Sequence, residues 1–176
     1  MGYLEVAARL LLATVFAVAL FGKVTGGRAY AAFADSIARM RVLPARVARP
    51  AALASVVTEG AVVLLLVLPW RWAAVAGFVL AAGLLAVFAA AIAISLRGGN
   101  RAPCRCFGAS ATPLGRGHIV RNLILIVIAL TGLAAAAAVG AGAGAIAIPG
   151  AVVAGAAGLV AGIVVTAYDD IVTLFR

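Results

Sequence analysis

The sequence has too few charged side chains to cover the surface of a soluble protein. Only 11% of its 176 residues are charged and 66% are hydrophobic, whereas soluble domains average about 25% charged. This composition excludes an ordinary soluble enzyme or binding module. Inside a bilayer, backbone polar groups are satisfied only in helices or closed barrels. Because the hydrophobic runs are continuous and do not alternate with polar residues, they predict helices.

Five long hydrophobic stretches are the predicted membrane spans. Four of them are long enough to cross a hydrocarbon core of about 30 Å as helices, and the first reaches that length by including Arg9. It lacks a basic leading region, so we expect a retained span and not a cleaved signal peptide. The spans are expected at about residues 4–22, 51–69, 72–96, 119–140 and 146–168. The chain is therefore predicted to be one all-α integral membrane domain, with four spans and an extended last one as the alternative.

Acidic residues are rarer than basic ones, five against fourteen, which gives a formal net charge of +9. In a soluble chain this excess would suggest nucleic-acid binding. Here most basic residues lie between the spans, in loops at about 23–50 and 97–118, and they predict membrane topology. We expect both loops in the cytoplasm, near anionic lipid, and the N-terminus outside. A lipid bilayer is an expected partner and nucleic acid is not.

The first basic loop contains a predicted amphipathic helix over about residues 29–41. Its apolar side chains recur at helical spacing, at Tyr30, Phe33, Ile37 and Met40. Such a helix is typical of the membrane interface. We interpret it as a connector with an interfacial anchor, and a gating role is the alternative.

Cysteine is also scarce, and the two cysteines, Cys104 and Cys106, lie one residue apart in the second basic loop. A disulfide at this spacing closes a small, strained ring, and strain makes a disulfide easy to reduce, as a redox-active pair requires. Arg105 and nearby arginines favour thiolate over thiol. One thiolate would attack a partner's disulfide, and the other would resolve the mixed disulfide.

Two other interpretations of the cysteines stay open. They could be inert structural thiols, or metal ligands with His118 as a third. Two Cys and one His at this spacing match zinc sites poorly and no fourth ligand is apparent, so no metal is expected. Histidine ionises near neutral pH, which makes His118 a candidate to assist a thiol. A surface position at the start of the fourth span is the alternative.

Glu59 is the second candidate, because it lies in the middle of a predicted span. A carboxylate there is costly unless it is protonated or paired, and it marks a functional site by default. Lys23, at the end of the first span, and Arg9, within it, are the candidate partners. The alternatives are a structural buried pair, and a role in proton supply or polar-ligand binding.

Six short segments carry a resemblance to a known family. They are Arg9-Leu10-Leu11, Phe21-Gly22-Lys23, Phe33-Ala34-Asp35-Ser36-Ile37, Leu43-Pro44, Glu59-Gly60 and Cys104-Arg105-Cys106-Phe107-Gly108. With them, the chain resembles the MauE family of methylamine-utilisation membrane proteins, which are related to DoxX-like four-helix bundles. The resemblance covers about residues 9–130, and its most specific part is the Cys-x-Cys-Phe-Gly segment after a span.

The resemblance implies a DoxX-like four-helix bundle in the bacterial cytoplasmic membrane, to which the last hydrophobic run adds a fifth span. It implies thiol-disulfide chemistry by Cys104 and Cys106 beside a thioredoxin-like partner, during maturation of a client protein with disulfides. Glu59 would be the membrane-embedded polar residue. No cofactor is evident, and a quinone would lack a supporting motif. Fold-level likeness does not establish activity.

The charge pattern and the resemblance conflict on one point. The charges predict a cytoplasmic cysteine loop, whereas disulfides are made outside the cytoplasm. A partner, a quinone, a loop that dips into the bundle or an inverted topology would each resolve this. Two other function classes also stay open: a non-catalytic assembly or scaffold subunit, and a small-molecule transporter that uses Glu59. The sequence shows no internal repeats of the kind found in many transporter folds, which counts against the transporter.

Overall fold

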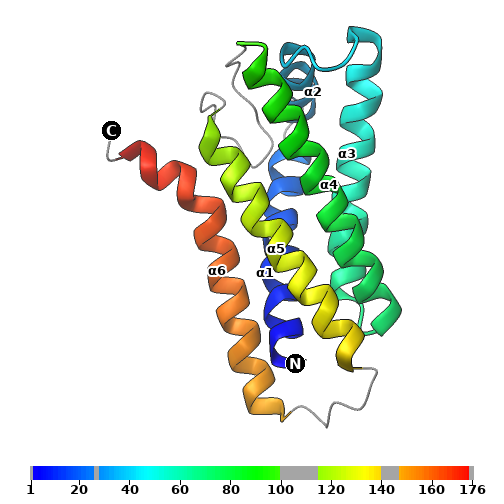
Figure 1. Cartoon of the computed structure of the whole chain (residues 1–176), viewed down its shortest axis with the longest axis vertical. Helices are drawn as coiled ribbons and strands as arrows, with labels where there is room; N and C mark the ends of the chain where they lie inside the picture. Colours follow the sequence, from blue (N-terminus) through cyan, green and yellow to red (C-terminus); the bar gives the residue numbers. More distant parts are fainter. Residues whose placement is uncertain (1, 26–27, 100–114, 140–146, 175–176) are drawn as a thin grey trace.

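The computed structural model describes residues 2–25, 28–99, 115–139 and 147–174, and these residues form helices joined by short turns. Five of the helices are long and apolar enough to cross a membrane, and α2 is the exception. The chain is therefore an all-α integral membrane protein, as its composition predicts (Figure 1). The helices are α1 (Gly2–Val24), α2 (Ala29–Arg39), α3 (Ala45–Val67), α4 (Arg71–Arg97), α5 (Arg116–Val139) and α6 (Ile148–Leu174).

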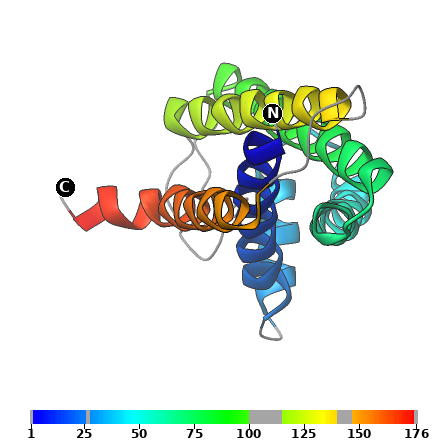
Figure 2. The same cartoon turned by 90° about the horizontal axis from the view of Figure 1, so that it is seen from below.

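Helix α1 is the centre of the bundle. It packs against α6, α3 and α5, while α4 packs against α3 and α5. Viewed along the bundle, α1 lies between α6 and α3, with α4 and α5 along a third side (Figure 2). Large side chains from four helices meet in the core, and they include Leu12, Phe16, Leu66, Phe78, Leu85 and Leu125. Apolar side chains on the outer faces are exposed, as contact with lipid requires.

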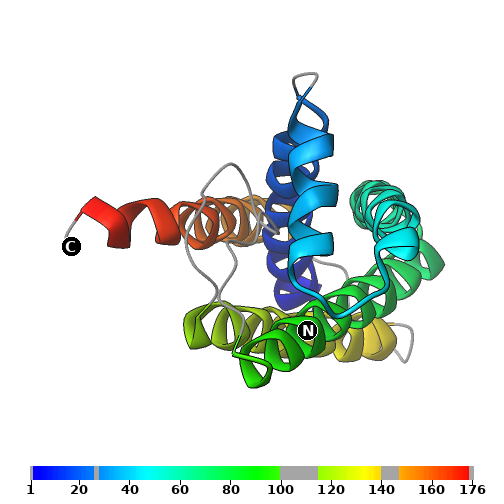
Figure 3. The ribbon, with the colours of Figure 1, turned by 90° about the horizontal axis from the view of Figure 1, so that it is seen from above.

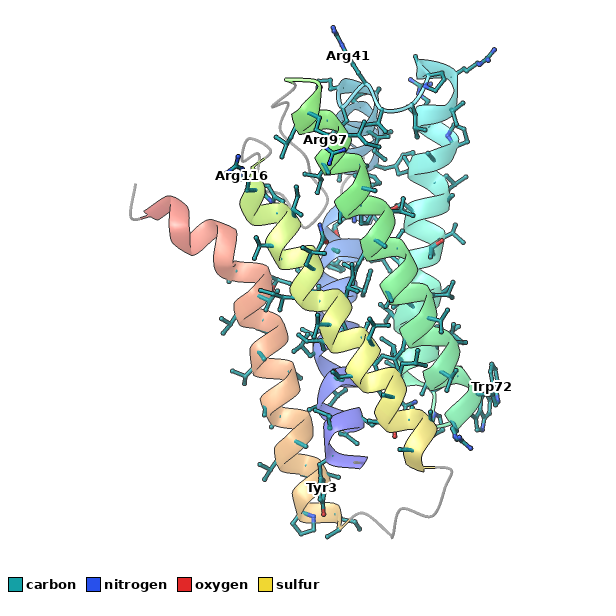
Figure 4. All side chains as sticks on the ribbon, in the orientation of Figure 1. Tyr3, Arg41, Trp72, Arg97 and Arg116 are labelled. Atoms are coloured by element: carbon teal, nitrogen blue, oxygen red, sulfur yellow. The ribbon has the colours of Figure 1, made fainter. Side chains whose placement is uncertain are left out.

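The two ends of the bundle differ in charge. We call the end where α1 and α4 finish the basic end, since it carries Arg28, Arg39, Arg41, Arg46, Arg49, Arg97 and Arg116. Figure 4 shows Arg41, Arg97 and Arg116 there, with Tyr3 and Trp72 at the opposite end. The rings of Trp70 and Trp72 stack, with centroids 5.7 Å apart. Paired tryptophans opposite a basic end are typical of a membrane protein's two interfaces.

Two arginines at the opposite end bind the last carbonyl groups of neighbouring helices. Arg9 Nε donates to Leu66 O at 3.0 Å, and its Nη2 donates to Leu68 O, at the end of α3. Arg71 donates to Ala136 O and Ala137 O of α5, at 3.1 and 3.0 Å. The last carbonyls of a helix have no partner within it. This explains how an arginine fits within the first span.

Helix α3 starts six residues before the span expected from residue 51. Pro44 is its N-cap, and Pro50 lies inside the helix. The additional turns carry Arg46 and Arg49 beyond the apolar run, toward the basic end. Glu59, in the middle of α3, lies beside the last turn of α1, where Lys23 is.

Helix α2 lies over the end of α1 when the molecule is viewed from the basic end (Figure 3). Its face with Phe33 and Ala34 packs against Ala52 of α3. The apolar face of α2 therefore packs on the bundle, and Phe33 lies in the interior of the bundle.

Candidate functional site

A buried ion pair joins the last turn of α1 to the middle of α3. Lys23 Nζ lies 2.6 Å from Glu59 Oε1, and each side chain is only 1% exposed. Of the two partners considered for Glu59, the structure therefore has Lys23. Arg9 instead pairs with Glu5 at 3.3 Å, one helical turn away at the opposite end. A direct ion pair at this distance offsets part of the cost of removing both charges from water.

Two further helices contribute to the surroundings of the pair. Phe33 of α2 places its ring centroid 4.8 Å from Lys23 Nζ, and the ring of Phe88 in α4 lies 6.0 Å away. An aromatic face within about 6 Å attracts an ammonium group through its quadrupole. Ser55, one turn before Glu59, donates its hydroxyl to Glu59 Oε1 at 3.3 Å. The site is thus built from α1, α2, α3 and α4.

The second carboxylate oxygen of Glu59 retains hydrogen-bonding capacity. Oε2 is buried and has no hydrogen-bond partner among the residues that the structure describes. Buried polar atoms are nearly always satisfied in folded proteins, so an exception needs an explanation. Chemically, this oxygen can accept a hydrogen bond or a proton.

A cavity of about 260 Å³ adjoins the ion pair. Ser55 and Phe88, which both contact the pair, also line this cavity, and Thr58 adds a second hydroxyl. The other walls are apolar side chains of α3, α4, the end of α2 and the segment after it. An apolar cavity with a few polar groups is the usual form of a small-ligand site. The pair therefore lies one side chain away from a space that could hold a lipid-soluble molecule.

The candidate residues from the sequence lie in different places. Cys104, Arg105 and Cys106 lie outside the described residues. His118 lies in the first turn of α5, and its backbone carbonyl accepts a hydrogen bond from Asn122 Nδ2 at 2.9 Å. Lys23 and Glu59 are the two candidates that the structure joins.

Sequence reasoning missed three residues of this site. Ser55 stands four residues before Glu59, and that helical spacing was a signal that could have identified it. Phe33 and Phe88 come from other helices, and both also fit the apolar pattern of a packed helix. Their position around Lys23 depends on how the helices pack, which no local pattern specifies.

Comparisons with known proteins agree with this architecture. The family model described as "Methylamine utilisation protein MauE" matches residues 1–135, which include Lys23, Glu59 and both cysteines. The "Methylamine utilization protein MauE" of Paracoccus denitrificans is 40% identical over 162 residues, covering 89% of this chain and 78% of that protein. No solved structure matches. The family match extends over α1 to α4 and most of α5, and on this evidence the chain belongs to the MauE family of membrane proteins.

Proposed function

We propose that this MauE-family protein is a membrane thiol-disulfide redox protein that acts through Cys104 and Cys106. The observation that carries the proposal is the sequence Cys104-Arg105-Cys106 within a membrane chain that has no other cysteine. The described ends of the two flanking helices support it, because Arg97 of α4 and Arg116 of α5 both lie at the basic end. Positive charge near a cysteine favours the reactive thiolate.

The proposed reaction is a thiol-disulfide exchange with a thioredoxin-like protein. A thiolate of the partner attacks the Cys104–Cys106 disulfide, which breaks that S–S bond and forms a mixed disulfide. The second partner thiolate then breaks the mixed disulfide and forms the partner's own disulfide. Two electrons pass to the cysteine pair, which takes up two protons and becomes a dithiol. The reverse sequence passes a disulfide to the partner.

The physiological setting follows from the relative. Its printed name assigns the Paracoccus protein to methylamine utilisation, and we propose the same process for this chain. Within that process, the pair would serve the maturation of another protein that contains disulfides. By the positive-inside rule, the basic end would face the cytoplasm.

For the buried pair, we propose a structural role. Lys23 and Glu59 hold α1 and α3 together and anchor Phe33 of α2. A transporter would instead use Glu59 for its substrate. A Glu59→Gln variant that folds but loses uptake of a solute, with thiol reactivity intact, would favour the transporter.

Trapping of the mixed disulfide tests the proposed function. We expect one of the single variants, Cys104→Ser or Cys106→Ser, first converted to a mixed disulfide with thionitrobenzoate, to accumulate a reducible adduct with a thioredoxin-like protein that lacks its own resolving cysteine. The partner's thiolate attacks the mixed disulfide and displaces thionitrobenzoate. The missing cysteine can no longer resolve the adduct. Non-reducing electrophoresis of membranes detects the adduct, and the double Ser variant is the control that should form none.

The same variants separate this function from the scaffold alternative. We expect the double Ser variant to support client maturation at less than about one hundredth of the wild-type rate, because it removes the reacting groups. Wild-type maturation by this variant, with loss after changes in the Tyr30–Met40 segment, would overturn the redox proposal and establish a scaffold.

A further inference from the structure

The cavity of about 260 Å³ beside the ion pair opens on the outer face of the bundle. In Figure 1, α3 and α4 are joined at one end of the bundle and diverge toward the basic end. Both helices line the cavity, and three of the lining residues, Leu43, Ala54 and Val87, are exposed. In a membrane protein, an exposed apolar rim of this kind faces the hydrocarbon of the bilayer. A molecule dissolved in the bilayer can therefore enter the cavity from the side.

Two hydroxyl groups interrupt the apolar lining of the cavity. Among the lining residues that the structure describes, only Ser55 and Thr58 have polar side chains. They are three residues apart in α3, so they lie on one face of the helix. Ser55 is only 7% exposed, which places it in the inner wall and not at the rim. A few polar groups in an apolar cavity fix the orientation of a ligand.

The hydrogens of both hydroxyl groups are already used within the chain. Thr58 Oγ1 donates to Ala54 O at 2.8 Å, and Ser55 Oγ donates to Glu59 Oε1 at 3.3 Å. A hydroxyl group has one hydrogen to donate and two lone pairs with which to accept. These two residues can therefore offer a ligand only acceptor capacity. The cavity should favour a molecule with its own O–H donor over one that has acceptors alone.

The buried carboxylate makes Ser55 the stronger acceptor of the two. A hydroxyl group that donates to a carboxylate is polarised, and its oxygen then accepts a further hydrogen bond more strongly. Glu59 Oε1, which accepts from Ser55, also lies 2.6 Å from Lys23 Nζ. A ligand hydroxyl that donates to Ser55 would thus complete a chain of hydrogen bonds from the cavity to the ion pair.

The size and the walls of the cavity favour a single aromatic ring. An apolar cavity of about 150 Å³ holds benzene in another protein. A volume of about 260 Å³ therefore accommodates one ring with a short substituent. The side chain of Phe88 lines the cavity, and aromatic rings attract each other beyond the effect of their apolar area.

We propose that the α3–α4 cavity binds a lipid-soluble phenol, which is an aromatic ring with a hydroxyl group and an apolar substituent. The phenolic hydroxyl donates to Ser55 Oγ, and the ring lies against Phe88. The substituent extends past Ala54 toward the bilayer. The proposal does not depend on the thiol-disulfide function, because none of these residues takes part in that exchange.

Photolabelling of the full chain in liposomes tests this site. The probe is a phenol that carries a photoreactive diazirine, and mass spectrometry identifies the labelled peptides. The competitors are para-propylphenol and its methyl ether, which keeps the ring and the oxygen but has no donor. They are compared at equal concentrations in the bilayer. We expect label on residues 51–58 and 84–91, and about fivefold stronger competition by the phenol than by the ether.

Ser55→Ala tests the hydrogen bond on which the proposal depends. We expect this variant to reduce the advantage of the phenol over its ether to less than about twofold, because the acceptor is lost. Ser36→Ala is the matched control. Ser36 is also buried, its hydroxyl donates to Phe33 O, and it does not line the cavity. This variant should leave the advantage of the phenol unchanged.

Two substitutions at exposed residues keep the test decisive if Ser55→Ala folds poorly. Ala54→Phe should fill the opening of the cavity and abolish the label in both peptides. Val57→Phe adds a ring to α3 at an exposed residue that does not line the cavity, and it should leave the label intact.

Two results would overturn the proposal. Equal competition by the phenol and its ether in the wild-type protein would show that the cavity takes any apolar molecule, such as a lipid chain. Unchanged labelling of Ala54→Phe would show that the phenol binds outside the cavity.

Discussion

Replacement of Glu59 with alanine is expected to lower the free energy of unfolding by about 3–5 kcal/mol. The reason is that Lys23, 2.6 Å away and 1% exposed, would remain as a buried charge without its carboxylate. Lys23→Ala should have an effect of similar size for the same reason. The measurement is SDS-induced unfolding in mixed micelles, followed by circular dichroism.

Two control variants make this prediction specific to the pair. The double variant Lys23→Met with Glu59→Met removes both charges and should recover most of the lost stability, because apolar side chains can replace a buried pair. Glu5→Gln breaks the other ion pair, but Arg9 keeps its carbonyl acceptors at the end of α3. It should cost about 1 kcal/mol, because a glutamine amide can still accept the hydrogen bond from Arg9. Losses below that value for both single substitutions at the buried pair would contradict the structural role.

The second large effect is expected at Gly158, where α6 crosses α1. A Cβ added there would overlap the carbonyl oxygen of Ala7, and one added at Gly162 would lie 2.9 Å from Leu11 O. The two backbones are thus in contact, as small residues allow in membrane bundles. Gly158→Ala should force the helices apart and cost about 1–3 kcal/mol. Thermal unfolding in detergent measures the loss.

Gly83 of α4 provides the matched control for Gly158. It is exposed, and an added Cβ would meet nothing within 4 Å. Gly83→Ala makes the same change in a long apolar helix without a contact, so it should leave stability unchanged or raise it, since alanine favours helix. Equal effects at both positions would show that α6 does not pack closely on α1.

The sequence was sufficient to predict the membrane class, because continuous apolar runs with few charges have no other stable form. Glu59 was identified for the same reason, as a carboxylate within such a run. Its partner could not be chosen between Lys23 and Arg9 from the sequence. That choice depends on how α1 and α3 pack against each other, which places Glu59 beside the last turn of α1.

The role of Arg9 also depended on tertiary packing. An arginine within the first span raised the expectation of a partner for Glu59, and the structure instead places it on the last carbonyls of α3. Helix ends need such donors, but which helix end lies beside a given side chain follows from the packing of the bundle. The aromatic rings around Lys23 were hidden for a similar reason, since both fitted an ordinary apolar pattern.

The redox proposal gives the buried pair and the cysteines different roles, so variants at the two places should have different effects. Variants of Lys23 and Glu59 should change stability first, and function only as far as the protein unfolds. Variants of Cys104 and Cys106 should leave the unfolding free energy nearly unchanged and abolish the exchange reaction. A chain with two cysteines can hold one disulfide at a time, so each cycle needs a separate donor and acceptor of electrons.

The central claim is tested most directly by a redox titration of Cys104 and Cys106 in membranes. Membranes are equilibrated in dithiothreitol buffers of graded potential and then alkylated, with an impermeant reagent to report the side of the thiols. The redox account predicts that both thiols switch together between dithiol and disulfide in a single two-electron transition at a physiological potential. Thiols that stay reduced at every potential, or a disulfide that no thioredoxin-like donor can reduce, would contradict it.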